Sequence, residues 1–391
     1  MANLRVAHIA DTHLGYRAFR DTALSGGINQ RTLDFEIAWH AAITAIIDEK
    51  PDLCIHAGDV FHYARPGWRE VRAFGAGLKR LVHAGIPTVV IGGNHDTSRL
   101  RAETSVFTAI AVMIPEVHFV CGYDMQLIHL KQLDTVVHCV PYGALQTDTQ
   151  VPLPELASKV NLLAIHGGVY SGNDPWRFSA AHSVIDISYD AMAYDYVALG
   201  HHHDCYMAKA KAWYSGPTER CGFSDEQGST GWALATVPGQ GKHPVVFHRP
   251  IASRPMRTLL DGKPLDCSGL KAEDIAAMAA ELVIAWEMPD GIARIKVEEI
   301  ARGETRIAQR LLDQATKGIC WKALLAPMSE AIGADWNEER QQPEGLGLQD
   351  LFREFVSSRT YDEEGFAEKF LERGLLAIIA AETSAKEEGQ E

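Results

Sequence analysis

The fold is decided by residues 53–62, which read LCIHAGDVFH. The apolar run at 53–57 predicts a short buried strand, and a burst of glycine, aspartate and histidine follows it at once. The same order recurs after apolar runs at 4–10, 88–91, 162–165 and 196–199. Helical patterns fill residues 32–48, 68–83 and 103–113 between them. This alternation predicts an α/β fold whose strands are buried on both faces.

Further strand-like runs predict a second sheet and set the domain boundaries. They lie at 126–130, 136–140, 205–214, 232–237 and 245–248. Because no long helix separates the first two, we expect two mixed sheets sandwiched by helices, a four-layer α/β (α+β) arrangement over residues 1–250. Two prolines at 250 and 255 mark a change. Residues 255–335 then read as a small α+β capping domain with helices at 272–285 and 305–315.

A polar linker at 337–344 precedes the last segment, residues 345–391, which we expect to be a helical tail. Its apolar residues recur at helical spacing and form one stripe, made of Leu348, Leu351, Phe352, Phe355 and Val356. Such a stripe either packs on the chain itself or binds a partner.

Composition limits the function classes. The 391 residues carry 37 basic and 51 acidic side chains, a net charge of −14, which excludes binding of a polyanion by overall charge. The seven cysteines form no CxxC pair, so the sequence indicates no thiolate zinc site and favours a reducing compartment. No apolar run reaches the roughly 18 residues of a membrane span, and no signal peptide is evident, so we expect a cytoplasmic protein.

Five polar bursts follow five of the predicted strands, where open α/β sheets gather ligand-binding side chains. They are Asp11-Thr12-His13, Gly58-Asp59-Val60-Phe61-His62, Gly93-Asn94-His95-Asp96, His166-Gly167-Gly168 and Gly200-His201-His202-His203. Each alone is weak, because a histidine after a strand is ordinary. Five together indicate a built site, since polar side chains are costly to gather and bury without a purpose.

The types of ligand atom in these bursts narrow the choice of metal. Carboxylate, imidazole and amide oxygen without thiolate suit manganese, iron or zinc, and they disfavour a structural thiolate zinc site. The ligands are too many for one ion. A two-metal centre bridged by one carboxylate accommodates them and suits an in-line displacement at phosphorus.

The ordered set DxH, GDxxH, GNHD, H, GHxH over residues 11–203 resembles the calcineurin-like metallophosphoesterases. Within them it is similar to the SbcD-type DNA repair nucleases, prokaryotic relatives of the eukaryotic meiotic recombination nuclease. The likeness continues through YSGPTER at 214–220 into the capping domain. It implies that Asp59 bridges two metals. It assigns the first metal to Asp11, His13 and His203, and the second to Asn94, His166 and His201.

The resemblance also implies three catalytic residues. His95 would face the phosphate and stabilise or protonate the leaving oxygen, with Asp96 holding its ring. His62 stands where protein phosphatases of this fold read GDxxDRG, and it resembles the nuclease branch, in which this histidine presents the DNA end to the metals. His202 takes a commonly apolar position and is expected to be a bystander, whereas His8 and His56 are expected in the core.

The sequence therefore predicts a hydrolase of ester bonds, a metal-dependent DNA exonuclease in double-strand-break repair and recombination. Endonuclease activity is compatible with the same motifs. The expected cofactors are two divalent ions, manganese first, with iron, zinc or magnesium as alternatives. The expected partners are DNA, bound also by the capping domain, and an SbcC-type SMC-like ATPase that binds the C-terminal helices. A homodimer is compatible with the same sequence.

Two alternatives stay open. The chain could be a small-substrate phosphodiesterase or phosphatase, for example for cyclic nucleotides, or a scaffold for the ATPase. Loop arginines are expected to contact DNA phosphates or else to pair with Glu70 and Glu103. They are Arg17, Arg20, Arg31, Arg65, Arg69, Arg99, Arg101 and Arg177.

Overall fold

The computed structural model describes residues 3–19, 27–98, 105–146, 158–169, 184–185, 193–239, 241–328, 371 and 375. Two compact units, Met1–Glu330 and Ala331–Glu391, divide the chain. The apolar stripe of the predicted tail lies outside the described residues, and so do Arg20, Arg99, Arg101 and Arg177. Within the described ranges, no helix combines the length and apolar character that crossing a membrane takes.

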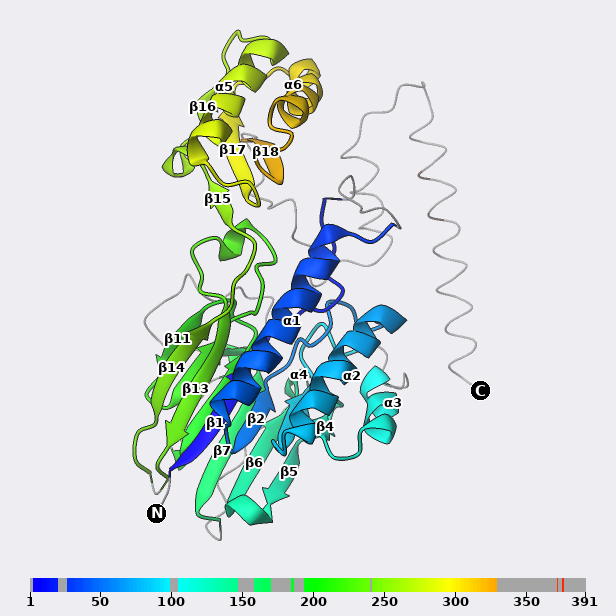
Figure 1. Ribbon diagram of the computed structural model, residues 1–391, viewed down its shortest axis with the longest axis vertical. Coiled ribbons are helices and arrows are strands. Elements are labelled where there is room, and N and C mark those ends of the chain that lie inside the picture. The colour runs from blue at the N-terminus through cyan, green and yellow to red at the C-terminus, as the bar shows by residue number, and fades with distance from the viewer. Residues whose placement is uncertain are drawn as a thin grey trace. The chain divides into compact units, whose positions relative to one another are not determined.

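The first sheet has six strands and is covered on one face by three helices (Figure 1). Its order is β14 (Val245–Pro250), β13 (Gly231–Val237), β1 (Leu4–Ile9), β2 (Leu53–His56), β3 (Thr88–Ile91) and β4 (His118–Val120). Strands β1 to β4 are parallel, and β13 and β14 are antiparallel to their neighbours. The helices are α1 (Gln30–Glu49), α2 (Trp68–His83) and α3 (Val106–Met113).

The second sheet also has six strands. Its order is β11 (Cys205–Lys209), β12 (Ala212–Ser215), β10 (Tyr196–Gly200), β7 (Val160–His166), β6 (Thr135–Val140) and β5 (Gln126–Leu130). The inner four are parallel and the two edge strands antiparallel. The predicted pair of mixed sheets is therefore confirmed. The short helix α4 (Tyr142–Leu145) packs on the outer face of this sheet, and a two-residue pair, β8 (Gly168–Val169) and β9 (Val184–Ile185), extends beyond β7.

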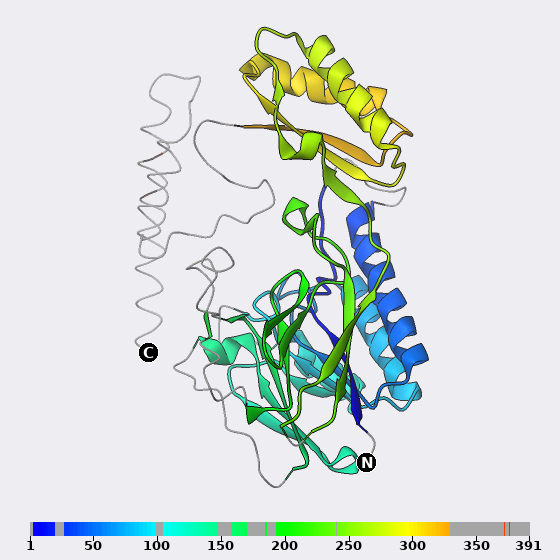
Figure 2. The ribbon, with the colours of Figure 1, turned by 90° about the vertical axis from the view of Figure 1, so that its left-hand side faces the viewer.

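Strand β1 shows why the layers form. Leu4 and Val6 point into the apolar core between the two sheets, whereas Ala7 and Ile9 point into the core beneath the helices. Successive side chains of a strand point to opposite faces, so an uninterrupted apolar run buries both faces at once. Figure 2 shows α1 and α2 lying together along one side of the sheets.

Residues 256–327 form a parallel α+β layer with a core of its own. Strands β15 (Met256–Thr258) and β16 (Leu265–Asp266) pair with one edge of β17 (Ile292–Glu298), and β18 (Lys322–Pro327) pairs with the other. Helices α5 (Ala272–Trp286) and α6 (Arg302–Ala315) cover it. Because this layer and the two sheets belong to one compact unit, the domain boundary near residue 250 stays a prediction.

Two of the local differences from the sequence expectation have a clear physical reason. Helix α1 begins two residues earlier than predicted because Asn29 caps it, accepting a hydrogen bond from the backbone N–H of Arg31 at 3.0 Å. Strand β4 was not predicted, since its three residues are too few to show a period.

The contact between α1 and α2 gives a stability prediction. Trp39 is buried and donates its indole N–H to the Ala73 carbonyl, and a Cβ at Gly77 would lie 2.5 Å from that nitrogen. We expect Gly77→Ala to lower the free energy of unfolding by about 1–3 kcal/mol through overpacking.

The matched control is Gly75→Ala in the same helix, where the nearest atom to a new Cβ is 3.8 Å away. It should be neutral or stabilising by up to about 1 kcal/mol, because alanine favours a helix interior. Urea denaturation compares the two, and equal stabilities would contradict the packing argument.

Candidate metal centre

The loops after β1 and β2 lie side by side at the carboxyl ends of their strands. The backbone N–H groups of Asp11 and His13 donate to the carbonyl groups of Gly58 and Asp59, both at 3.0 Å. Asp11, His13, Asp59 and His201 all have positive φ, at 53°, 38°, 52° and 102°. Such strain persists only where the surrounding structure imposes it, and it is concentrated at functional sites.

One group of candidate ligands collects around His13. Asp11, His13 and Asp59 are buried, and their ligand atoms lie within 4.8 Å of one another. The His13 and His203 Nε2 atoms are only 3.1 Å apart. Two imidazole nitrogens at that separation repel each other unless a proton or a cation lies between them. The arrangement therefore suits a bound cation.

The second group collects around Asn94. Its Oδ1 atom is 3.0 Å from His166 Nε2 and 3.1 Å from His201 Nδ1. His166 and His201 also group with Asp59 within 4.8 Å. Asn94 follows β3, His166 is the last residue of β7, and His201 follows β10, so the group draws on both sheets.

Asp59 lies between the two groups. Its Oδ2 atom is 3.7 Å from His13 Nε2, and its Oδ1 atom is 3.4 Å from His166 Nε2. Gly93 leaves room for this carboxylate, because a Cβ there would lie 2.1 Å from Asp59 Oδ1. Each carboxylate oxygen thus faces one group, which is the arrangement that a bridging ligand requires.

Burial and charge together perturb the titration of these groups. Burial lowers the pKa of His166 and His203, but the carboxylates of Asp59 and Asp225 respectively outweigh it and raise both to about 9. Burial raises the pKa of Asp11 to about 7, although His166 and His203 act against this. Burial also raises the pKa of Asp59, yet His166 and the other histidines hold it well below its usual value.

The donor set fits divalent cations. It offers carboxylate, imidazole and amide atoms, the ligands of manganese, iron and zinc. A ligand imidazole must lose its extra proton, so bound cations would replace the protons that His166 and His203 otherwise hold near neutral pH.

His62 and His95 lie beside the first group. Their rings stack with centroids 4.9 Å apart and an interplanar angle of 23°, and both group with His13 within 4.8 Å. The Nδ1–H of His95 donates to the His62 carbonyl at 2.8 Å, which leaves its Nε2 for other partners.

The role predicted for Asp96 is wrong in one respect. Its carboxylate accepts hydrogen bonds from the backbone N–H groups of Val60, Phe61 and Gly93 at 2.9, 2.9 and 3.0 Å. It therefore ties the GDxxH loop to the GNHD loop, and the His62 carbonyl takes the place at the His95 ring that we expected for Asp96. A buried carboxylate needs hydrogen-bond donors, and the two loops supply three backbone N–H groups to Asp96 here.

Two residues near the site were missed by the sequence analysis. Asp225 Oδ2 is 3.0 Å from His203 Nδ1, and Cys221 Sγ groups with His13 and His203 within 4.8 Å. A thiol therefore lies at the edge of a donor set that we expected to lack one. Neither residue follows a predicted strand, so no sequence pattern marks them.

Two of the loop arginines pair with carboxylates, as one of the two expectations held, although these carboxylates are not the one expected at Glu70. Arg31 is 1% exposed and forms ion pairs with Asp34 at 2.6 Å and Glu219 at 3.1 Å, so its predicted contact with DNA is wrong. Arg69 pairs with Glu36 at 2.6 Å. Arg17 and Arg65 are exposed.

Three further histidines, His8, His56 and His202, lie where we expected them from the sequence. His8 is buried and hydrogen-bonded to the Tyr196 hydroxyl at 2.8 Å, and the His56 Nε2 lies 3.0 Å from the Thr12 hydroxyl. His202 packs on the Tyr214 ring at 4.6 Å and belongs to none of the candidate ligand groups found among the described residues.

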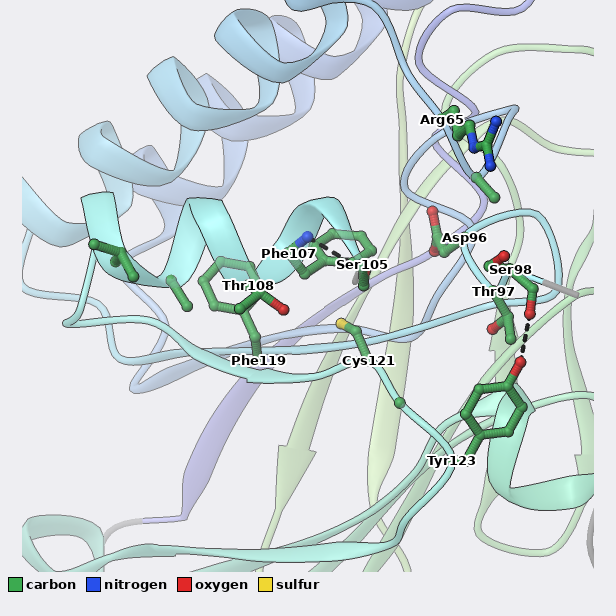
Figure 3. Close-up of a pocket in the computed structure, with 14 residues that line it drawn as sticks. Arg65, Asp96, Thr97, Ser98, Ser105, Phe107, Thr108, Phe119, Cys121 and Tyr123 are labelled. Atoms are coloured by element: carbon green, nitrogen blue, oxygen red, sulfur yellow. Dashed lines mark hydrogen bonds between the residues drawn. The ribbon is translucent and has the colours of Figure 1, made fainter. Parts of the chain in front are cut away.

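A cavity of about 830 Å³ lies beside the loops that carry the candidate ligands (Figure 3). It is lined by Asp96, by Phe107 and other residues of α3, by Arg65 and by Tyr123, whose hydroxyl donates to the Ser98 carbonyl. None of the predicted metal ligands lines it. Asp96 thus contacts this cavity as well as the GDxxH and GNHD loops.

Several known proteins are similar to this chain in sequence. The family model for calcineurin-like phosphoesterases matches residues 4–205. Three archaeal proteins named DNA double-strand break repair protein Mre11 are similar to this chain. The one from Methanocaldococcus jannaschii is 26% identical over 223 residues, 54% of this chain and 56% of its own length. The one from Methanosarcina mazei is 27% identical over 244 residues, 61% and 37%.

The third, from Thermoplasma acidophilum, is 36% identical over 129 residues, 32% of this chain and 31% of its own length. The chain thus spans between about a third and just over half of these relatives. Among solved structures, a dimetal phosphatase from Danio rerio has a TM-score of 0.35 at 10% identity, covering 63% of this chain and 99% of that one.

The close approach at Gly93 gives a metal-binding prediction. Gly93→Ala should displace the Asp59 carboxylate and weaken Mn²⁺ binding by about tenfold or more, measured by isothermal titration calorimetry. Gly122→Ala is the control, because a Cβ there meets nothing within 4 Å. Unchanged Mn²⁺ binding by the folded Gly93 variant would contradict the assignment of Asp59.

Proposed function

This chain belongs to the calcineurin-like phosphoesterase family, as its motifs predicted, and we propose that it hydrolyses phosphodiester bonds in DNA with two divalent cations. The observation that carries the proposal is the Asp59 carboxylate, whose two oxygens face two groups of ligands beside the stacked His62 and His95. The Mre11 relatives, named for double-strand break repair, support DNA as the substrate.

The ligand assignment follows the two groups. Asp11, His13 and His203 would hold one ion, and Asn94, His166 and His201 the other, with Asp59 shared. Manganese is our first choice, because hard oxygen and borderline nitrogen donors are mixed here. When bound, the ions would act as Lewis acids toward the phosphoryl oxygens and make water a better nucleophile.

His95 is the proposed proton donor to the leaving oxygen. Its Nδ1–H is occupied by the His62 carbonyl, so a proton carried at Nε2 is the one that the ring can pass on. The bond to a backbone carbonyl also fixes the direction of the ring. Asp96 contributes indirectly, since it holds together the loops that carry Asp59 and His95.

His62 is proposed to present the DNA end. It stacks on His95 on one side and meets the rings of Tyr16 and Tyr63 at 4.9 and 4.6 Å on others. It is therefore placed beside the reacting groups without belonging to the bridging set. Exposed Arg17 and Arg65 and the layer at 256–327 are proposed to contact the DNA backbone locally, since the net charge of −14 provides no general attraction.

Substitutions of His95 and of His62 should affect the two kinds of substrate differently. We expect His95→Gln to lower the turnover of both linear duplex DNA and a small aryl phosphodiester by about 10²–10⁴-fold, because a proton donor serves either substrate. His62→Ala should reduce DNA-end digestion at least about tenfold more than it reduces aryl phosphodiester hydrolysis. Both rates are measured with Mn²⁺.

His202→Ala is the control, since this histidine packs on Tyr214 outside the ligand groups described above and should leave both rates unchanged. An equal loss on the two substrates in His62→Ala would favour a small-substrate phosphodiesterase. Absence of any metal-dependent hydrolysis by the unmodified protein would favour a scaffold for the ATPase.

We propose in addition that residues 345–391 bind the coiled coil of an SMC-like ATPase of the SbcC type. The support is the apolar stripe that follows the polar linker, the pattern of a helix that enters a groove. Three of its residues, Leu351, Phe352 and Phe355, would form the centre of the contact.

Charges on the stripe test this partner. Leu351→Glu with Phe355→Glu should abolish co-purification of the ATPase, while the melting temperature and Mn²⁺-dependent cleavage stay unchanged. Arg353→Glu with Ser357→Glu places the same side chains off the stripe and should keep the partner. A large fall in melting temperature with the partner retained would show that the stripe is part of the fold.

A further inference from the structure

One turn of the chain contacts both the His203 ring and the α+β layer at 256–327. This turn, residues 223–226, contains the short 3-10 helix Phe223–Asp225. Asp225 is 6% exposed, and its Oδ2 atom is 3.0 Å from His203 Nδ1. The same oxygen accepts the backbone N–H of Cys221 at 2.8 Å, and Oδ1 accepts the Ser224 hydroxyl at 3.1 Å. The carboxylate is therefore held from several directions.

The contact with Asp225 decides which nitrogen His203 offers to a metal. A carboxylate accepts, so the Nδ1 of His203 must donate. The Nε2 atom then faces His13 Nε2 at 3.1 Å, on the side of the ligand group. A ligand histidine that donates its other nitrogen to a carboxylate has its ring direction and tautomer fixed in this way.

The other residues of the turn are gripped by the α+β layer. Phe223 packs with Met256 and Ile292, and the Arg294 guanidinium lies 4.3 Å over its ring. The Glu226 carboxylate accepts both the backbone N–H and the hydroxyl of Thr258, each at 2.7 Å. Strands β15 and β17 therefore hold the residues on either side of Asp225.

A third set of bonds joins the turn to Arg220 in its own segment, and joins that segment to the loop after β1. The guanidinium of Arg220 donates to the carbonyls of Asp225 at 3.1 Å and Gly228 at 3.0 Å. The Tyr16 hydroxyl donates to the Cys221 carbonyl, and the Tyr16 ring meets His62 at 4.9 Å. The turn thus has little freedom to move independently of either side.

We propose that Asp225 is the positioning residue for His203, and that the turn 223–226 makes metal affinity at this histidine depend on its packing against β15 and β17. The proposal rests on the proposed function only in taking His203 as a ligand. A substrate held by the α+β layer would then act on the metal site through four consecutive residues. By linkage, metal binding would tighten the packing of the same turn.

The first test measures metal binding by calorimetry, without DNA. Asp225→Asn should weaken one of the two Mn²⁺ sites by about 10–100-fold and leave the other near its original affinity. It should also change the visible spectrum of the Co²⁺-loaded protein, because a neutral amide makes a weaker hydrogen bond to the ligand ring than a carboxylate does. Asp225→Glu keeps the carboxylate and should recover part of the affinity.

The second test changes a residue that touches no ligand. Glu226→Ala removes the two bonds to Thr258 and should weaken the same Mn²⁺ site about three- to tenfold. Glu281→Ala is the matched control, since it removes one exposed carboxylate from α5 away from the turn, and it should have no effect.

The outcomes separate the two proposals. Two unchanged Mn²⁺ sites in Asp225→Asn would overturn the positioning role, and an effect of Asp225→Asn without one of Glu226→Ala would overturn the link to β15. If Asp225→Asn fails to fold, Glu226→Ala and Asp225→Glu still decide the outcome, and no loss in either overturns the proposal. Failure of the unmodified protein to bind Mn²⁺ would instead contradict the proposed function.

Discussion

The Asp59 carboxylate is the interaction on which the site depends. It is 2% exposed, and a buried charge of this kind is costly unless it is paired. Two histidines from different groups approach its two oxygens, and the backbone N–H of His95 donates to Oδ1 at 2.9 Å. Its own backbone has positive φ, and Gly93 must lack a side chain to make room for it. The nearby loops are therefore arranged around one carboxylate.

The two sheets bring the loops around this carboxylate together. Parallel strands β1, β2 and β3 end at one edge of the first sheet, and β7 and β10 end at one edge of the second. The apolar core between the sheets sets their separation, so loops distant in sequence meet at a fixed distance. The Asp96 carboxylate then joins the second and third loops through backbone bonds. Rigid layers thus hold loops whose own conformations are strained.

A buried polar network connects the sheets to the α+β layer. Arg31 pairs with Asp34 and Glu219, and Arg254 pairs with Asp34 while its guanidinium lies 4.5 Å over the Trp321 ring. Because burying charges costs desolvation energy, ion pairs of this kind add little net stability, whereas loss of one partner would leave a buried charge uncompensated. Arg31, which we expected from the sequence to contact DNA, instead holds α1 against the segment after β12. The turn at 223–226 reaches the same layer by a separate route.

The sequence by itself determined the longer strands and helices within residues 4–327 and the polar set at their ends, because burial on both faces leaves uninterrupted apolar runs that end in polar bursts. Short elements such as β4 and β16 leave no period to read. It also indicated the family through motifs whose spacing spans both sheets. Only the tertiary structure decided the partners within the site. The fold brings Asp225 and Cys221 beside His203, and no periodic pattern in the sequence marks either residue. Asp96 binds backbone N–H groups of two loops instead of the His95 ring. Arg31 is buried for the same reason, since a charge pattern along a sequence does not show which carboxylates the fold brings to it.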